Sequence, residues 1–158
     1  MKVYRTDKLY TRKSVSEDSK NMYIFTDNTD RDSGKNLIDA DSWYCKKYGV
    51  NKHYPTMTTA IIRGLPNAYP ITTQRWYNAE HKGVNGRWTD GDYEEFVKII
   101  DNDFEEISKN LDKFDNVIFP QGGIFNSKIS AISMERTPKL FQYLRGKCVE
   151  CFSKYITK

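Results

Sequence analysis

The chain has 158 residues, which is the length of one ordinary domain. Its 38% hydrophobic and 14% aromatic residues exclude a chain that is disordered throughout. The 25 basic and 21 acidic residues leave a net charge of only +4, whereas nucleic-acid-binding domains carry a denser basic face. Nucleic acid is therefore not expected as a partner, and a membrane is not expected either, because no run approaches ~20 apolar residues.

The start of the chain and its cysteines indicate a cytoplasmic protein. The opening segment MKVYRTDKLYTRKSV lacks the apolar stretch of a secretory signal. Three cysteines, Cys45, Cys148 and Cys151, are an odd number and do not form a disulfide framework. Cys148 and Cys151 have CxxC spacing, but a structural zinc site needs four ligands and both residues fit one face of a helix. We therefore interpret both as core residues and expect no metal.

The first 20 residues differ from the rest, because they hold six basic residues and few aliphatic ones. This composition predicts a basic N-terminal segment over residues 1–20 and a single domain over residues 21–158. Val3 and Tyr4 could begin a short strand. The polar stretch 11–20 is interpreted as a flexible loop.

Three short apolar runs predict strands, at residues 22–26, 68–73 and 117–119. Continuous apolar runs are typical of strands buried on both faces of a parallel sheet. Pro70 indicates that the second strand lies at an edge or bends, because proline cannot donate to a neighbouring strand.

Helical patterns alternate with these strands. A short helix is predicted over residues 43–48 and another over 56–65, ended by Gly64 and Pro66. The clearest helix begins near Asp90 and repeats apolar residues at spacings of three and four. A last helix begins at Thr137, as the cap, and Pro138. The alternation predicts an α/β domain with helices packed on a central, mostly parallel sheet.

Polar loops directly follow the three predicted strands, at residues 26–33, 72–75 and 120–128. In α/β sheets, ligands bind beyond the carboxyl ends of the strands, so these loops are expected to converge on one site. Carboxylates, amides and hydroxyls suit a ribose, arginine suits a phosphate, and paired glycines allow close approach of the backbone. The candidate ligand-binding residues are Thr26, Asp27, Asn28, Arg63, Asn67, Thr72, Thr73, Arg75, Gly122, Gly123, Asn126, Lys128 and Arg136.

The same residues also have ordinary structural interpretations. The Asp-Asn cluster can form an Asx turn, each arginine can pair with a surface carboxylate, and Gly122-Gly123 can form a tight turn that needs a positive φ. The sequence contains neither GxxxxGK[ST] nor GxGxxG, so no cofactor is expected.

Several blocks in a fixed order carry a resemblance. They read YIFTDN at 23–28, AIIR at 60–63, PNA at 66–68, ITT at 71–73 and RTPKLFQYL at 136–144. Together they resemble an uncharacterised family of bacteriophage and bacterial proteins whose members read roughly FGDN, GGQAxIR, NAxGIPTK and RAPxTFxxL. The resemblance implies a Rossmann-like single domain and a phage origin. Gln74 stands where the family has a lysine.

Three functions remain open from the sequence. The leading hypothesis is a phage-type protein that binds a nucleotide or a nucleotide-derived signal, such as an ADP-ribose-like molecule or a cyclic nucleotide, and sequesters a host defence signal in the infected cell. The second is a hydrolase or transferase acting on a phosphoribosyl bond, with Asp27 or Asp30 as the acid–base group. The third is an inhibitor that binds a host protein through the acidic helix 90–106 and the aromatic segment 76–88. A homo-oligomer is compatible with each of them.

Overall fold

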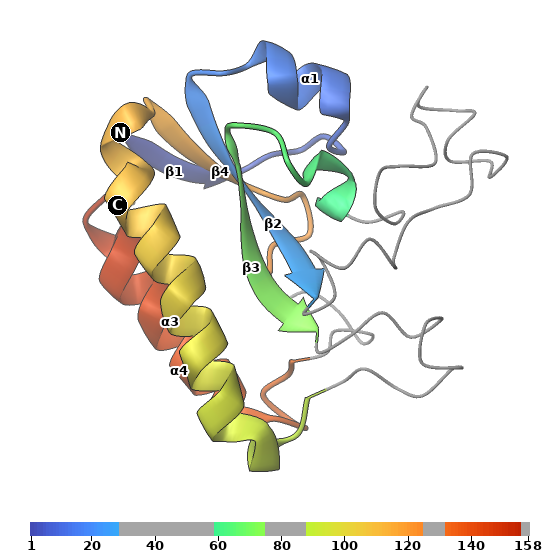
Figure 1. Ribbon diagram of the computed structural model, residues 1–158, viewed down its shortest axis with the longest axis vertical. Coiled ribbons are helices and arrows are strands. Elements are labelled where there is room, and N and C mark those ends of the chain that lie inside the picture. Colours follow the sequence, from blue (N-terminus) through green and yellow to red (C-terminus); the bar gives the residue numbers. More distant parts are fainter. Residues whose placement is uncertain (29–58, 75–87, 125–131, 156–158) are drawn as a thin grey trace, which may run out of the picture.

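The computed structural model describes residues 1–28, 59–74, 88–124 and 132–155. In these ranges one sheet with the order β1-β4-β2-β3 runs through the molecule, and each neighbouring pair of strands is parallel (Figure 1). Its strands are β1 (Lys2–Arg5), β2 (Asn21–Asn28), β3 (Ala68–Gln74) and β4 (Asn116–Phe119). The three strands predicted from apolar runs are confirmed, and β3, which contains Pro70, lies at an edge as predicted.

Helices cover both faces of this sheet. Two long helices, α3 (Tyr93–Asn110) and α4 (Pro138–Phe152), lie side by side on one face (Figure 1). The short helix α1 (Arg12–Glu17) and the 3-10 helix η1 (Thr59–Ile62) pack over the other face. The fold is therefore α/β and Rossmann-like, as the alternation of strands and helices predicted.

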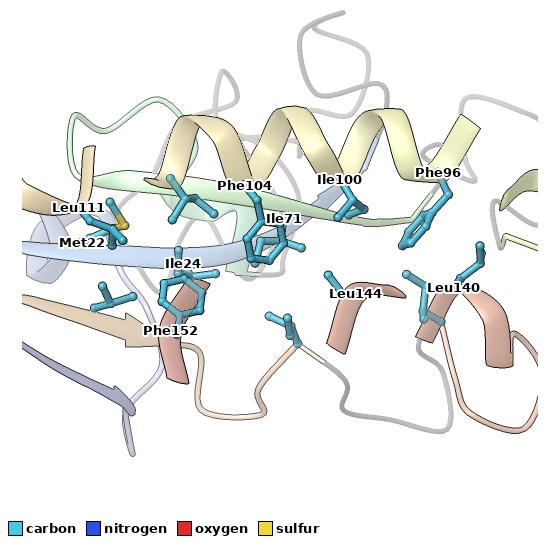
Figure 2. Packing of buried hydrophobic residues seen from close by; sticks show 14 of the residues in the cluster. Met22, Ile24, Ile71, Phe96, Ile100, Phe104, Leu111, Leu140, Leu144 and Phe152 are labelled. Atoms are coloured by element: carbon cyan, nitrogen blue, oxygen red, sulfur yellow. The ribbon is translucent and has the colours of Figure 1, made fainter. Parts of the chain in front are cut away.

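The larger core lies between the sheet and the two long helices. Figure 2 shows Phe96, Ile100 and Phe104 of α3 directed into the same interior as Leu140 and Leu144 of α4. Because these residues recur every three or four positions, each helix presents one apolar stripe to the sheet. Trp88 belongs to this core: it is fully buried, and its ring meets that of Phe96 edge to face at 5.5 Å. Trp88 is therefore a core residue, and the hypothesis that made it part of a protein interface is wrong for this residue.

A smaller core lies on the opposite face, where α1 corrects one prediction. The stretch 11–20 was expected to be a loop, but residues 12–17 form a helix. Thr11 caps it: its hydroxyl accepts from the N–H of Ser14 at 3.0 Å, and the Ser14 hydroxyl accepts from the N–H of Thr11 at 3.4 Å. Val15 then packs in the core with Phe25 of β2. A single buried apolar residue in a polar segment gave no periodic signal, which is why the helix was missed.

Two other predicted helices can be compared with the structure. The helix predicted over 56–65 has only the 3-10 turn η1 within the described residues, and Gly64, with φ of 89°, ends the segment as predicted. The last helix, α4, begins at Pro138 with Thr137 at the N-cap position, as predicted, although the Thr137 hydroxyl bonds the N–H and the carbonyl of Ser133 and makes no capping hydrogen bond. The helix predicted over 43–48 lies outside the described residues.

None of the helices in the described ranges is both long enough and apolar enough to cross a membrane. Cys148 and Cys151, on α4, are partly buried against the larger core, as predicted.

Candidate functional site

The central strand β2 extends beyond its neighbour β4. The register pairs Tyr23 with Ile118, which places Phe119, the end of β4, level with Ile24. β2 continues to Asn28, and over this second half β3 is the one strand of the described ranges that pairs with it. The carboxyl half of β2 therefore needs other partners on the side that β4 leaves.

Two side chains supply those partners. The Tyr10 hydroxyl donates to the carbonyl of Ile24 at 2.7 Å and lies 3.2 Å from the carbonyl of Ile118. Two residues further along β2, the N–H of Thr26 donates to the Thr59 hydroxyl at 2.9 Å, and the hydroxyls of the two threonines lie 3.0 Å apart. Burial raises the pKa of Tyr10, so its hydroxyl keeps its proton at neutral pH. Hydroxyl groups thus bond the backbone of β2 at the point where β4 ends.

The next described elements after β2 and β4 lie on opposite faces of the sheet. After β2, the chain returns as η1 on the face covered by α1. After β4, it returns as α4 on the face covered by α3. Adjacent parallel strands whose connections diverge in this way form a crevice at their carboxyl ends, where ligands of α/β proteins bind. The candidate site of this fold is therefore the carboxyl end of β2 beside β4.

An ion pair stands at that position. Arg63, one residue after η1, donates from Nε to the Asp27 carboxylate at 2.8 Å, and its Nη2 pairs with the second carboxylate oxygen. The Asp27 side chain is 0% exposed and the Arg63 side chain is 14% exposed. Arg63 is therefore the member of the pair that reaches the surface. The buried Asp27 carboxylate fixes the plane of its guanidinium from the interior.

Neighbouring groups hold this pair in place. Arg12 of α1 donates to the carbonyls of Ile61 and Arg63, at 3.0 and 2.7 Å, and so fixes the backbone that carries Arg63. Thr72 of β3 pairs in register with Asp27, and paired residues of parallel strands face the same side of the sheet. Four residues predicted for the site are thus adjacent: Thr26, Asp27, Arg63 and Thr72.

Two other predicted residues form contacts outside this cluster. Asn67 is at the opposite, amino end of the sheet, where its side-chain amide donates to the carbonyls of Val15, Asp18 and Asn21 at 2.9 to 3.2 Å. Its role is to join α1 to the starts of β2 and β3. Arg136, before α4, donates to the carbonyl of Trp88 at 2.6 Å and thereby links two core segments.

Gly122 and Gly123 lie on the face of α4, away from Arg63. They line a cavity with residues of β1 and α4. The N–H of Gly123 donates to the carbonyl of Pro120 at 2.8 Å, and its φ is 71°. This is the tight turn with positive φ that the structural interpretation of the glycine pair predicted. Thr73 faces the α3 side of β3, one residue beyond Thr72.

Asp30, Arg75, Asn126 and Lys128 lie outside the described residues. Asn28 is the last residue of β2, at the carboxyl end as expected. The assignment of these residues to the site stays a prediction.

Sequence reasoning missed several polar groups. Asp103 interrupts the apolar stripe of α3, and its carboxylate accepts from the N–H of Thr72 at 2.8 Å, on the open edge of β3. An acid at a buried helical position was the available signal. Tyr10 and Arg12 had no such signal, because their partners are carbonyl groups of distant segments. In the described part of the chain, no three His, Cys, Asp or Glu side chains come together as metal ligands would.

Comparison with known proteins assigns the chain to a family. A family model described as a family of unknown function, DUF7831, matches residues 5–147. The chain belongs to this family. No curated protein and no solved structure matches it. Membership agrees with the resemblance to an uncharacterised family, so the function has to be argued from the site.

Proposed function

We propose that the protein binds a nucleotide or a nucleotide-derived signal at the carboxyl end of β2, with a phosphate on Arg63. The observation that carries this proposal is the Asp27–Arg63 pair at the point where β2 and β4 diverge. Guanidinium groups bind phosphate bidentately, and one already oriented by a carboxylate loses less rotational freedom on binding.

The chemistry of the surroundings supports a sugar-phosphate. The hydroxyls of Thr26 and Thr59 lie beside the same strand end, and Thr72 lies next to Asp27 in the sheet. Such groups can exchange hydrogen bonds with ribose hydroxyls or phosphate oxygens. ADP-ribose-like molecules and cyclic nucleotides combine both features. If the family is phage-encoded, as the sequence blocks suggest, this binding would sequester a defence signal of the host.

The geometry favours binding over turnover. A phosphoribosyl hydrolase that used Asp27, the one of its two candidate acids within the described residues, would need this carboxylate in contact with the substrate. The Asp27 side chain is fully buried, and both of its oxygens face Arg63. A carboxylate held this way is poorly placed to exchange protons with a ligand. The role that we propose for Asp27 is to orient Arg63.

Two measurements test the proposal. Mass spectrometry of small molecules released from the protein after purification from cells should find a phosphorylated nucleoside compound, and the native mass in the same run should give the oligomeric state. Incubation of the protein with the identified compound, followed by chromatography, should then return it unchanged. Release of a product over time would favour the enzyme, and a protein that carries no phosphate compound and binds none would contradict the proposal.

A further inference from the structure

A cavity lies on the face of the sheet that α4 covers, between β1, the turn after β4 and the second half of α4. Its volume is about 640 Å³. The walls are largely apolar and include Val3, Phe119, Val149 and Phe152. Pockets for small organic ligands have volumes of about 300–1,000 Å³ and mainly apolar walls. The cavity therefore has the size and character of a ligand site.

Two arginines line this cavity, Arg5 from the end of β1 and Arg145 from α4. Within residues 1–28, 59–74, 88–124 and 132–155, neither guanidinium forms an ion pair or a hydrogen bond. Arg12 and Arg136, by contrast, donate hydrogen bonds to backbone carbonyls. Two positive charges that meet no acid among the described residues, at one apolar cavity, suit an anion as their ligand.

Helix α4 supplies the part of the wall that would complement the apolar group of a ligand. Cys148 lies in the cavity wall, and burial raises the pKa of its thiol to about 12, so the wall is uncharged there. The carbonyl end of α4, at Phe152 and Ser153, carries the negative end of the helix dipole. The anionic group is therefore expected at the arginines and the apolar group against Val149 and Phe152.

Another cavity, of about 430 Å³ between α3 and α4, lacks this complementarity. Its charged groups pair with one another: Lys147 lies 3.2 Å from Asp101, and the same carboxylate accepts from the Tyr143 hydroxyl. Its lining also mixes further acids with lysines. Because acids outnumber lysines in this lining, it does not complement an anion as the cavity beside β1 does.

We infer that the cavity beside β1 binds a small amphipathic anion, an organic acid or phosphate monoester whose apolar group fills the cavity while Arg5 and Arg145 hold its charge. This site goes beyond the proposed nucleotide site, because the two lie on opposite faces of the sheet and share no charged residue.

The test uses 8-anilinonaphthalene-1-sulfonate as a fluorescent probe of the full chain, displaced by decanoate or by decanol. The acid and the alcohol share their chain and differ in charge. Decanoate should displace the probe at a concentration at least tenfold lower than decanol. In R5Q/R145Q this preference should fall at least tenfold, whereas K98Q/K139Q, which removes the same charge from exposed positions elsewhere on the helices, should keep it.

Three results would overturn the inference. One is equal displacement by acid and alcohol in the native protein. Another is an unchanged preference in R5Q/R145Q, with its circular dichroism and melting temperature the same as those of the native protein. The third is a dimer in native mass spectrometry that excludes the probe, since a second copy of the chain would then be the occupant. V149W, at an exposed position of the wall, should block decanoate while leaving Arg5 and Arg145 in place.

Discussion

Arg63 and Asp27 are 36 residues apart in the sequence and meet in a two-point ion pair at the end of the central strand. The carboxylate is fully buried and the guanidinium reaches the surface. Breaking a buried pair from one side leaves an uncompensated charge, which costs far more than the pair contributes. The pair is therefore expected to set both the local stability and the orientation of Arg63.

Replacement of Arg63 by methionine should destabilise the protein by about 3–5 kcal/mol at neutral pH, because it removes the guanidinium that binds the buried Asp27 carboxylate. Without that positive charge, burial favours the protonated form of the carboxyl, so the loss should be smaller at pH 5 than at pH 7. Urea unfolding at the two pH values measures this. A loss that is equal at both, or below 1 kcal/mol, would show that Asp27 does not depend on Arg63.

The double variant D27N/R63Q should recover much of that stability. Asn keeps the shape of Asp, Gln keeps a shorter polar side chain in place of Arg, and together the two substitutions leave the net charge unchanged. Neutral amides can hydrogen-bond where the ion pair stood, so the double variant should be more stable than R63M. The same urea experiment at pH 7 checks the order of the two variants, and the reverse order would contradict the account of the pair.

Tyr10→Phe should cost about 1–3 kcal/mol, because the carbonyl of Ile24 loses its buried donor. The variant should also change the response to alkali. The pKa of Tyr10 is raised in the folded protein, so the unfolded chain loses its proton first, and stability falls as the pH rises above about 10. Tyr23 is shifted in the same direction by burial and by its bond to Asp18. Stability measured between pH 8 and 11 should therefore decline less steeply in Tyr10→Phe, and an identical slope would count against this assignment.

Asn67→Asp should unfold the protein without involving ligand. The substitution puts a carboxylate oxygen where the amide donates to the carbonyls of Val15, Asp18 and Asn21. Replacing a buried donor with a charged acceptor is expected to cost more than about 3 kcal/mol. Asn67→Ala, which removes the donor without adding charge, should cost less and bind the ligand normally. Loss of ligand binding by well-folded Asn67→Ala would return this residue to the site.

Cys148 should react slowly with iodoacetamide at pH 8. Its pKa of about 12, raised by burial, gives a thiolate fraction about 1,000-fold smaller than that of a thiol with a pKa of 9. Peptide mass spectrometry, which separates the three cysteines, should find Cys148 unmodified in the native protein and modified in urea. Rapid labelling of the native protein would indicate that α4 opens, and a disulfide with Cys151 would restore the redox interpretation that we reject.

Local pattern predicted most of the fold and only part of the site. The strands 22–26, 68–73 and 117–119 and the two long helices follow from apolar spacing, because burial of one face dictates that spacing. Pro70 correctly marked an edge strand. The α1 helix was missed because its stability comes from a cap and one buried valine rather than from a periodic stripe.

Site residues were harder to predict, because a polar residue at a strand end has several uses. Asp27 and Arg63 were candidates in separate loops, and only the fold shows that they bond each other. Asn67 looked like a ligand group from its neighbours in sequence, but the crossover of the chain places it at the amino end of the sheet. Arg5 and Arg145 lie in a predicted basic segment and a predicted helix, where no pattern marked either as a ligand group, and the fold brings them to one cavity.

Isothermal titration of ADP-ribose and 3′,5′-cyclic AMP into about 0.1 mM protein tests the central claim, that Arg63 receives the phosphate of a nucleotide, most directly. At least one of them should bind with a dissociation constant below ~1 mM, and the neutral nucleoside adenosine should bind at least tenfold more weakly. R63K, which keeps the charge and loses the planar two-point contact, should weaken binding at least tenfold, whereas K98Q should leave it unchanged. Binding of equal strength by native protein, R63K and D27N/R63Q, or no binding of either nucleotide, would contradict the account.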